Sequence, residues 1–138
     1  MIPTRDQVRA LWDTYDLPAY KRNHVTLVAA VALYLAEKLD KLGEPIDTRL
    51  LEAASLLHDI DKNIPKLPGE QHPDTGVRIL RELGMDEVAG LVKSHSLHAI
   101  LQSECTPQSW EAKLLYLSDK MVKHSIITVD ERFALWQH

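Results

Sequence analysis

The most informative segment of this chain is Leu50-Leu51-Glu52-Ala53-Ala54-Ser55-Leu56-Leu57-His58-Asp59. Its apolar residues recur at helical spacing, and Leu51 and Ala54 place His58 on the same buried face. A helix that ends such a face in two ionisable side chains buries polar groups, which costs free energy unless a partner compensates. Divalent transition metals accept imidazole and carboxylate ligands together, so a metal ion would be such a partner.

Two more polar side chains interrupt apolar helical faces elsewhere in the chain. His24 shares a face with Leu27 and Val28, and Asp119 lies one turn after Leu115. Taken alone, a core histidine is more often a hydrogen-bonded residue than a ligand, and an unpartnered buried aspartate would take up a proton. Taken together, side chains from three helices can meet at one metal in the core of a bundle. The candidate ligands are His24, His58, Asp59 and Asp119.

Length and composition predict one globular domain over residues 1–138. The 16 Lys and Arg against 20 Asp and Glu give a net charge of −4, so the basic field of a nucleic-acid-binding protein is absent and no such partner is expected. No apolar run approaches the ~20 residues of a membrane span, and residues 1–6 lack the pattern of a signal peptide. The single cysteine, Cys105, allows no intrachain disulfide and no Cys-rich zinc site, and we expect a cytoplasmic protein.

The pattern of helix caps and breakers predicts an all-α fold, a compact multi-helix bundle with the metal site in its core. Thr4 is a plausible N-cap, Pro18 breaks the chain after Leu17, and Gly43 suits a helix end. The proline-containing residues 60–69 read as a loop. Helices are expected over residues 5–13, 19–42, 48–58, 73–83, 86–98, 107–124 and, at the end, 130–137.

The order of these ligands resembles the HD-domain superfamily of metal-dependent phosphohydrolases, named for its His-Asp doublet. The segment from Leu56 to Lys62 is similar to the family's "LLHDIGK" stretch, and Leu117-Ser118-Asp119-Lys120 to its closing "ADK". His72-Pro73-Asp74-Thr75-Gly76-Val77 and Val92-Lys93-Ser94-His95 resemble the two intermediate histidine segments of the family. The resemblance covers residues 22–123 and is closest to small stand-alone members, including the diadenosine-polyphosphate hydrolase branch. The Gly-Tyr-Pro element of the cyclic-dinucleotide phosphodiesterases is absent.

The resemblance implies that the four candidate ligands hold one metal ion. It further implies that His72 and His95 hold a second ion, with Asp59 as a bridge. His98 competes with His95 for the inward position. Asp61 stands where the commoner family pattern has glycine, so the geometry of the loop after the doublet is open.

The ligand set suits Fe, Mn, Ni, Zn or Mg, as one or two ions. Such a metal lowers the pKa of bound water and polarises a phosphoryl oxygen, so His58, Asp59 and Lys62 are the predicted catalytic residues, with Asp59 or a nearby acid taking the proton. Positive charge for the substrate phosphate is predicted from Arg22, Lys62, Lys120 and Lys123, for which a solvated charged face is the alternative.

The sequence thus predicts a phosphohydrolase that acts on a nucleotide or related small phosphate ester. One alternative is a non-catalytic module that senses a nucleotide, but such a module would usually lack a ligand, and none of the four is missing. Another is a di-iron site that uses oxygen instead of water. Trp110 and Trp136 lie late in the chain and belong either to the core or to the interface of a possible homodimer.

Overall fold

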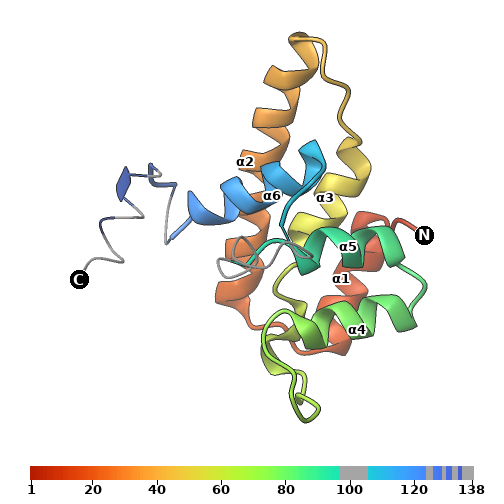
Figure 1. Cartoon of the computed structure of the whole chain (residues 1–138). Coiled ribbons are helices and arrows are strands. Elements are labelled where there is room, and N and C mark those ends of the chain that lie inside the picture. Colours follow the sequence, from red (N-terminus) through yellow and green to blue (C-terminus); the bar gives the residue numbers. More distant parts are fainter. Residues whose placement is uncertain (97–105, 124–125, 129, 132–133, 135–138) are drawn as a thin grey trace.

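The computed structural model describes residues 1–96, 106–123, 126–128, 130–131 and 134 (Figure 1). These residues contain no β-strand, only an isolated antiparallel bridge between Val122 and Ile126, so the all-α prediction is confirmed. Among the described helices, none has the length and apolar character needed to cross a bilayer. The elements in chain order are α1 (Arg5–Thr14), α2 (Ala19–Lys41), α3 (Thr48–Leu57), the 3-10 helix η1 (Ile60–Asn63), α4 (Asp74–Glu82), α5 (Asp86–Lys93) and α6 (Trp110–Lys120).

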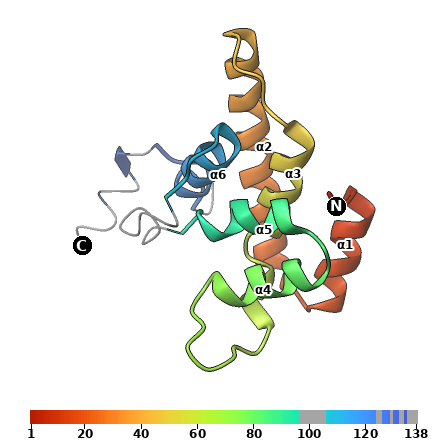
Figure 2. The same cartoon turned by 45° about the vertical axis from the view of Figure 1, so that its right-hand side comes forward.

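The 23-residue helix α2 is the longest helix of the described bundle. It packs against α3 and α6, while α5 packs against both α3 and α4 (Figures 1 and 2). Of the apolar face predicted for α2, Val28 is fully covered and Leu27 is partly exposed, while Val25 and Ala32, which were not predicted, are fully covered. Leu57 and Leu115, from α3 and α6, are equally covered, so the three helices share one core. Burial of this continuous apolar surface is the main force that holds them together.

The end of α3 places the His-Asp doublet in the centre of the molecule. Asp47 caps the start of the helix by accepting a hydrogen bond from the backbone N–H of Leu50 (3.1 Å). Near the other end, the indole Nε1 of Trp12 on α1 donates to the carbonyl oxygen of Leu56 (2.9 Å), which satisfies one of the unpaired carbonyl groups of the last turn. The chain then leaves the helix at His58 and continues into η1.

A glycine brings α4 close to η1. A Cβ atom at Gly76 would lie 3.3 Å from Cγ2 of Ile60 and 3.5 Å from Cβ of Asp61, so even an alanine would press on η1. The loop before α4 is tied to that helix by Glu70, whose carboxylate accepts a hydrogen bond from Nε of Arg78 (2.9 Å) and from Oγ1 of Thr75 (3.0 Å). The Arg78 guanidinium in turn lowers the pKa of Glu70 to about 2. This packing positions His72, the residue before Pro73.

The helix boundaries match the predictions for the first half of the chain and are shorter in the second. The predicted loop 60–69 contains η1, α5 ends at Lys93 and not at residue 98, and α6 spans residues 110–120 and not 107–124. The start of α6 is set by Ser109, whose side chain caps it by accepting a hydrogen bond from Ala112 (3.1 Å). Residues 97–98 and most of the predicted terminal helix lie outside the described residues. So does Trp136, whereas Trp110 is 41% exposed and donates to Glu44; the homodimer stays a prediction.

Candidate metal centre

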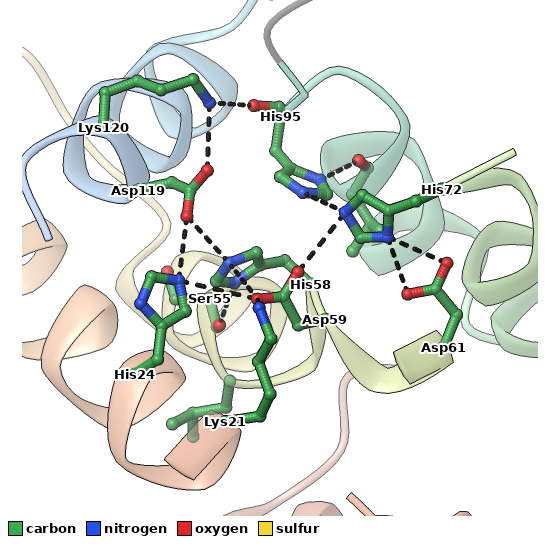
Figure 3. Close-up of polar contacts among 12 residues, drawn as sticks. Lys21, His24, Ser55, His58, Asp59, Asp61, His72, His95, Asp119 and Lys120 are labelled. Atoms are coloured by element: carbon green, nitrogen blue, oxygen red, sulfur yellow. Dashed lines mark hydrogen bonds and ion pairs between the residues drawn. The ribbon is translucent and has the colours of Figure 1, made fainter. Parts of the chain in front are cut away.

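The six predicted ligands come together at one place, although they are spread over 96 positions of the chain (Figure 3). They belong to α2, to the junction of α3 and η1, to the loop before α4, to the residues just after α5, and to α6. Their donor atoms form overlapping groups in which all atoms lie within 4.8 Å of one another. In the same order, the ligands are His24, His58 and Asp59, His72, His95 and Asp119.

Four of them form what we call the inner group: His24, His58, Asp59 and Asp119. Oδ1 of Asp119 lies 3.0 Å from Nε2 of His24 and 3.2 Å from Nε2 of His58. Oδ2 of Asp59 lies 3.6 Å and 3.4 Å from the same two nitrogens. Two imidazoles and two carboxylates therefore face a common point, as the apolar patterns predicted.

The outer group consists of Asp59, His72 and His95. Nε2 of His72 lies 3.1 Å from Nε2 of His95 and 3.4 Å from Oδ1 of Asp59. Asp59 therefore belongs to both groups, and it directs a different oxygen to each. A carboxylate in this position has the geometry to bridge two ions.

The Nδ1 atoms of three histidines each form a hydrogen bond on the side of the ring away from the cluster. These bonds determine whether the Nε2 atoms carry a proton or a lone pair. Nδ1 of His58 lies 2.6 Å from the carbonyl oxygen of Ser55, and Nδ1 of His95 lies 2.6 Å from that of Val92. Because a carbonyl oxygen only accepts hydrogen bonds, both Nδ1 atoms carry the proton and both Nε2 atoms turn a lone pair to the cluster when the ring is neutral. Nδ1 of His72 faces a carboxylate in the same way.

This arrangement fits a metal ion. The Nε2 atoms of His72 and His95 would otherwise oppose two lone pairs at 3.1 Å, with no acceptor–donor pair between neutral rings. A cation placed among them would be bound by both, and metal-ligating histidines are usually held through their other nitrogen in this manner. The donor set of nitrogen and carboxylate oxygen, without thiolate, suits Fe, Mn, Ni, Zn or Mg and does not choose among them.

Burial and charge set the protonation of the centre. Burial alone lowers the pKa of His58, but the carboxylates of Asp59 and Asp119 raise it to about 9. For His95, burial and the neighbouring His58 lower the pKa to about 3. Burial alone raises the pKa of Asp59, but His58 and Lys21 hold it below its ordinary range. Burial acts on Asp119 in the same direction, and hydrogen bonds from the histidines of the inner group hold its pKa well below that range.

Two residues of the centre were not predicted as part of it. Nζ of Lys21 forms an ion pair with Oδ2 of Asp59 at 3.1 Å. Its position, three residues before His24, is the signal that could have found it, since residues three apart share a helix face. Asp61, read in the sequence only as a departure that affects the loop, accepts the hydrogen bond from Nδ1 of His72 at 2.8 Å.

The predicted phosphate-binding cations lie in three different environments. Lys62 and Lys123 are exposed and line cavities beside the centre. Lys120 is buried, and its Nζ donates to the carbonyl oxygen of His95 (2.7 Å) and to Oδ2 of Asp119 (3.0 Å), so it holds Asp119 in place. A contact of these lysines with substrate stays a prediction.

Arg22 is not brought to the centre, which corrects its predicted position on the wall of the site. Its guanidinium donates to the carbonyl oxygens of Leu17 (2.6 Å) and Trp12 (3.1 Å) and pairs with Asp13 (2.8 Å). The reason is helical geometry: a residue two positions before His24 lies about 200° around the helix axis. Of the two histidines that competed for the inward position, His95 faces the site, and His98 lies outside the described residues.

Two cavities are lined by ligands of the centre. The larger has a volume of about 820 Å³, and Tyr20, Leu27 and Lys123 line it together with every ligand except His58. The smaller, of about 230 Å³, is lined by Lys62 and Lys66 among others. The residues common to both are Lys21, Asp59 and His72. The two cavities therefore lie next to each other at Asp59.

Comparison of the sequence with known proteins identifies the family of this chain. The HD domain model matches residues 22–123, which contain all six ligands. The chain belongs to the HD-domain family. Members of the family are generally metal-dependent hydrolases, which agrees with the donor set found here.

Two curated relatives share the HD region. One is an uncharacterized protein of Methanocaldococcus jannaschii, 33% identical over 81 residues, which are 59% of this chain and 47% of the relative. The other is Ribonuclease Y of Aquifex aeolicus, 35% identical over 85 residues, which are 59% of this chain and 14% of that protein. The chain therefore spans less than half the length of either relative. No solved structure gives a significant match. These relatives do not confirm the diadenosine-polyphosphate hydrolase branch, which stays a prediction.

Proposed function

We propose that this HD-domain protein is a phosphohydrolase that uses metal-activated water to cleave a nucleotide or a related small phosphate ester. The observation that carries the proposal is the convergence of six nitrogen and oxygen ligands, with Asp59 shared between the two groups. A structural cluster would need only pairs of opposite charge, whereas here two histidine Nε2 atoms face each other at 3.1 Å. Such an arrangement is explained by cation binding.

In this proposal each group of residues has a defined role. The inner group would hold one ion, the outer group a second, and Asp59 would bridge them. When bound, the metal supplies a water nucleophile of lowered pKa and polarises a phosphoryl oxygen. Because both oxygens of Asp59 would bind ions, another nearby carboxylate would accept the proton of that water. Lys21 and Lys62, which line the smaller cavity, would bind the phosphate oxygens.

The larger cavity supports a substrate with an organic part. Its volume of about 820 Å³ lies in the ~300–1,000 Å³ range of small-molecule sites. Tyr20, which is 59% exposed, and Leu27 offer aromatic and apolar surface there. A nucleoside fits this description, because its base has a flat apolar face and its phosphates would reach the lysines. The net charge of −4 argues against a long nucleic acid as substrate.

The test is hydrolysis of a panel by metal-stripped protein that is re-supplied separately with Mn, Fe, Ni, Co or Mg. The panel contains mononucleotides, dinucleoside polyphosphates, a generic phosphodiester and a short RNA. Asp59→Ala is measured in parallel, with the exposed Asp40→Ala on α2 as the matched control. Activity that requires metal and Asp59 but not Asp40 supports the proposal, and the preferred substrate names the class.

Other outcomes would replace the proposal. Tight metal and nucleotide binding without turnover of any compound would favour a sensing or regulatory module. Consumption of oxygen by the iron-loaded protein would favour a di-iron oxygenase. Cleavage of the RNA alone would overturn the small-molecule substrate and extend the likeness to Ribonuclease Y from sequence to activity.

A further inference from the structure

The histidines of the centre are held through Nδ1 by two different kinds of acceptor. His58 and His95 are buried, and backbone carbonyl oxygens hold both. The side chain of His72 is 39% exposed and precedes α4, and a carboxylate holds it. Both oxygens of Asp61 lie near its Nδ1, at 2.8 Å and 3.0 Å (Figure 3).

Asp61 is placed for this contact and for no other charge pair. Its side chain is 3% exposed, and among the described residues no lysine or arginine forms an ion pair with it. A buried carboxylate without a partner is costly, and His72 is the partner that the structure provides. Gly76 packs against this segment, because a Cβ atom there would lie 3.3 Å from Cγ2 of Ile60 and in ordinary contact, at 3.6 Å, with Cγ of Asp61.

We propose that Asp61 is the positioning residue of the outer metal ion. By accepting the Nδ1–H bond, it fixes the tautomer and the orientation of the His72 ring, so that Nε2 points to Asp59 and His95. The negative charge behind the ring makes Nε2 a better electron donor to a cation. The commoner family pattern, with glycine at this position, has no side chain that could do this. The inference rests on the proposed metal-dependent function and adds to it how the second ion is retained.

The effect should be selective for the outer group. Among the described residues no hydrogen bond or ion pair joins Asp61 to His24 or His58, and the anchors of His58 and His95 are backbone atoms that no substitution at Asp61 removes. Loss of such a supporting carboxylate typically weakens a metal site ~10–100-fold. We therefore expect that loss for the outer ion only, while the affinity of the inner ion stays the same.

The experiment is a calorimetric titration of the metal-stripped full chain with Mn²⁺, together with electron paramagnetic resonance at each stoichiometry. The variants are Asp61→Asn, which keeps the shape, Asp61→Gly, which restores the common pattern, and His72→Ala. The matched control is Asp74→Asn, because Asp74 supports the same loop by accepting a hydrogen bond from the backbone of Gln71 (3.1 Å) and contacts no ligand. Circular dichroism checks that each variant is folded.

The expected result is two Mn²⁺ ions with a spin-coupled signal in the wild type and in Asp74→Asn. In both Asp61 variants the second affinity falls ~10–100-fold and the coupled signal is lost at equal metal, as in His72→Ala. An unchanged second affinity in the Asp61 variants would overturn the inference, as would equal loss of both ions in folded protein. Binding of only one ion by the wild-type protein would overturn the inference about Asp61 but would leave the proposed phosphohydrolase function in place. Wild type that binds no metal ion would overturn the proposed function itself.

Discussion

The inner and outer groups share Asp59 but are built in different ways. The inner histidines lie on α2 and at the end of α3, among side chains of the packed core, and His58 is completely buried. The outer group depends on His72, which lies in a loop, is 39% exposed and is held by one carboxylate. The inner group is therefore part of the fold, whereas the outer group is an addition whose strength a single side chain can change.

This difference suggests a division of work. A ligand set held by the core keeps its geometry without further support, which suits an ion that stays bound. An ion held at the exposed edge would exchange more easily, and two of its ligands, Asp59 and His72, line both cavities.

The largest expected difference is between His58→Ala and His72→Ala. His58→Ala removes a buried ligand and one of the side chains that face Asp59 and Asp119, so we expect loss of the inner ion and a fall in activity of ~10³-fold or more. His72→Ala should keep the inner ion and lose the outer one. Metal analysis after dialysis, together with steady-state kinetics, measures both. Full metal content in His58→Ala would mean that the inner group is assigned wrongly.

The pH dependence of metal binding should also separate the groups. With its pKa raised to about 9, His58 carries a proton at neutral pH in the metal-free protein and must release it to bind an ion. The affinity of the inner ion should therefore rise ~tenfold per pH unit below pH 9 and level off above it. His95, with its pKa lowered to about 3, has no proton to release over the same range.

The measurement is calorimetry at several pH values in buffers that differ in ionisation enthalpy. Proton release on binding of the first ion, falling to zero above pH 9, is the expected pattern. If neither ion releases a proton at pH 7, the carboxylates do not hold His58 in its charged form.

The sequence was sufficient for the inner group because its members break apolar faces. His24, His58 and Asp119 each occupy a position where the helical pattern requires an apolar residue, and Asp59 adjoins one of them. The helices that carry them were also predictable, since caps and breakers define their ends. The family resemblance added His72, which lies beside a helix start, and His95, with which His98 competed for the inward position.

The roles of Asp61 and Arg22 could not be read in the same way. Asp61 depends on how residues 64–73 fold back onto η1, which is tertiary packing that no local pattern records. Arg22 was assigned by closeness in sequence, although a two-residue offset turns a side chain to another face of a helix. Lys21 shows the converse, because its three-residue offset from His24 places it on the same helix face, although it was not predicted.

Substitution of an aromatic residue in the larger cavity tests whether that cavity binds the base of a nucleotide. Tyr20 lines the larger cavity, and Tyr34 lies on the same helix with the same exposure of 59% but outside the cavity. Removing an aromatic platform for a base typically costs ~1–3 kcal/mol, so Tyr20→Ala should raise KM for a nucleotide ~10-fold. Tyr34→Ala should not change it. Neither variant should affect hydrolysis of a small phosphate ester without a base, which assays the metal centre alone.

The smallest expected effect concerns the contact between α4 and η1, which lies next to the outer group. In Gly90→Ala on α5, the new Cβ meets nothing within 4 Å, so the better helix former should stabilise the protein by ~0.5–1 kcal/mol. Gly76→Ala has the same intrinsic gain but presses on Ile60, the residue before Asp61, and we expect the gain to be cancelled or reversed. Chemical unfolding measures this difference, and a Mn²⁺ titration of the same variants measures the second affinity. A lower affinity for the outer ion in Gly76→Ala, with an unchanged affinity for the inner ion, would show that the packing of α4 on η1 controls the hydrogen bond between Asp61 and His72. Equal stabilisation by both substitutions would mean that η1 can move to accommodate the added methyl group. The geometry of the outer group would then depend on the loop before α4 and not on the contact between α4 and η1.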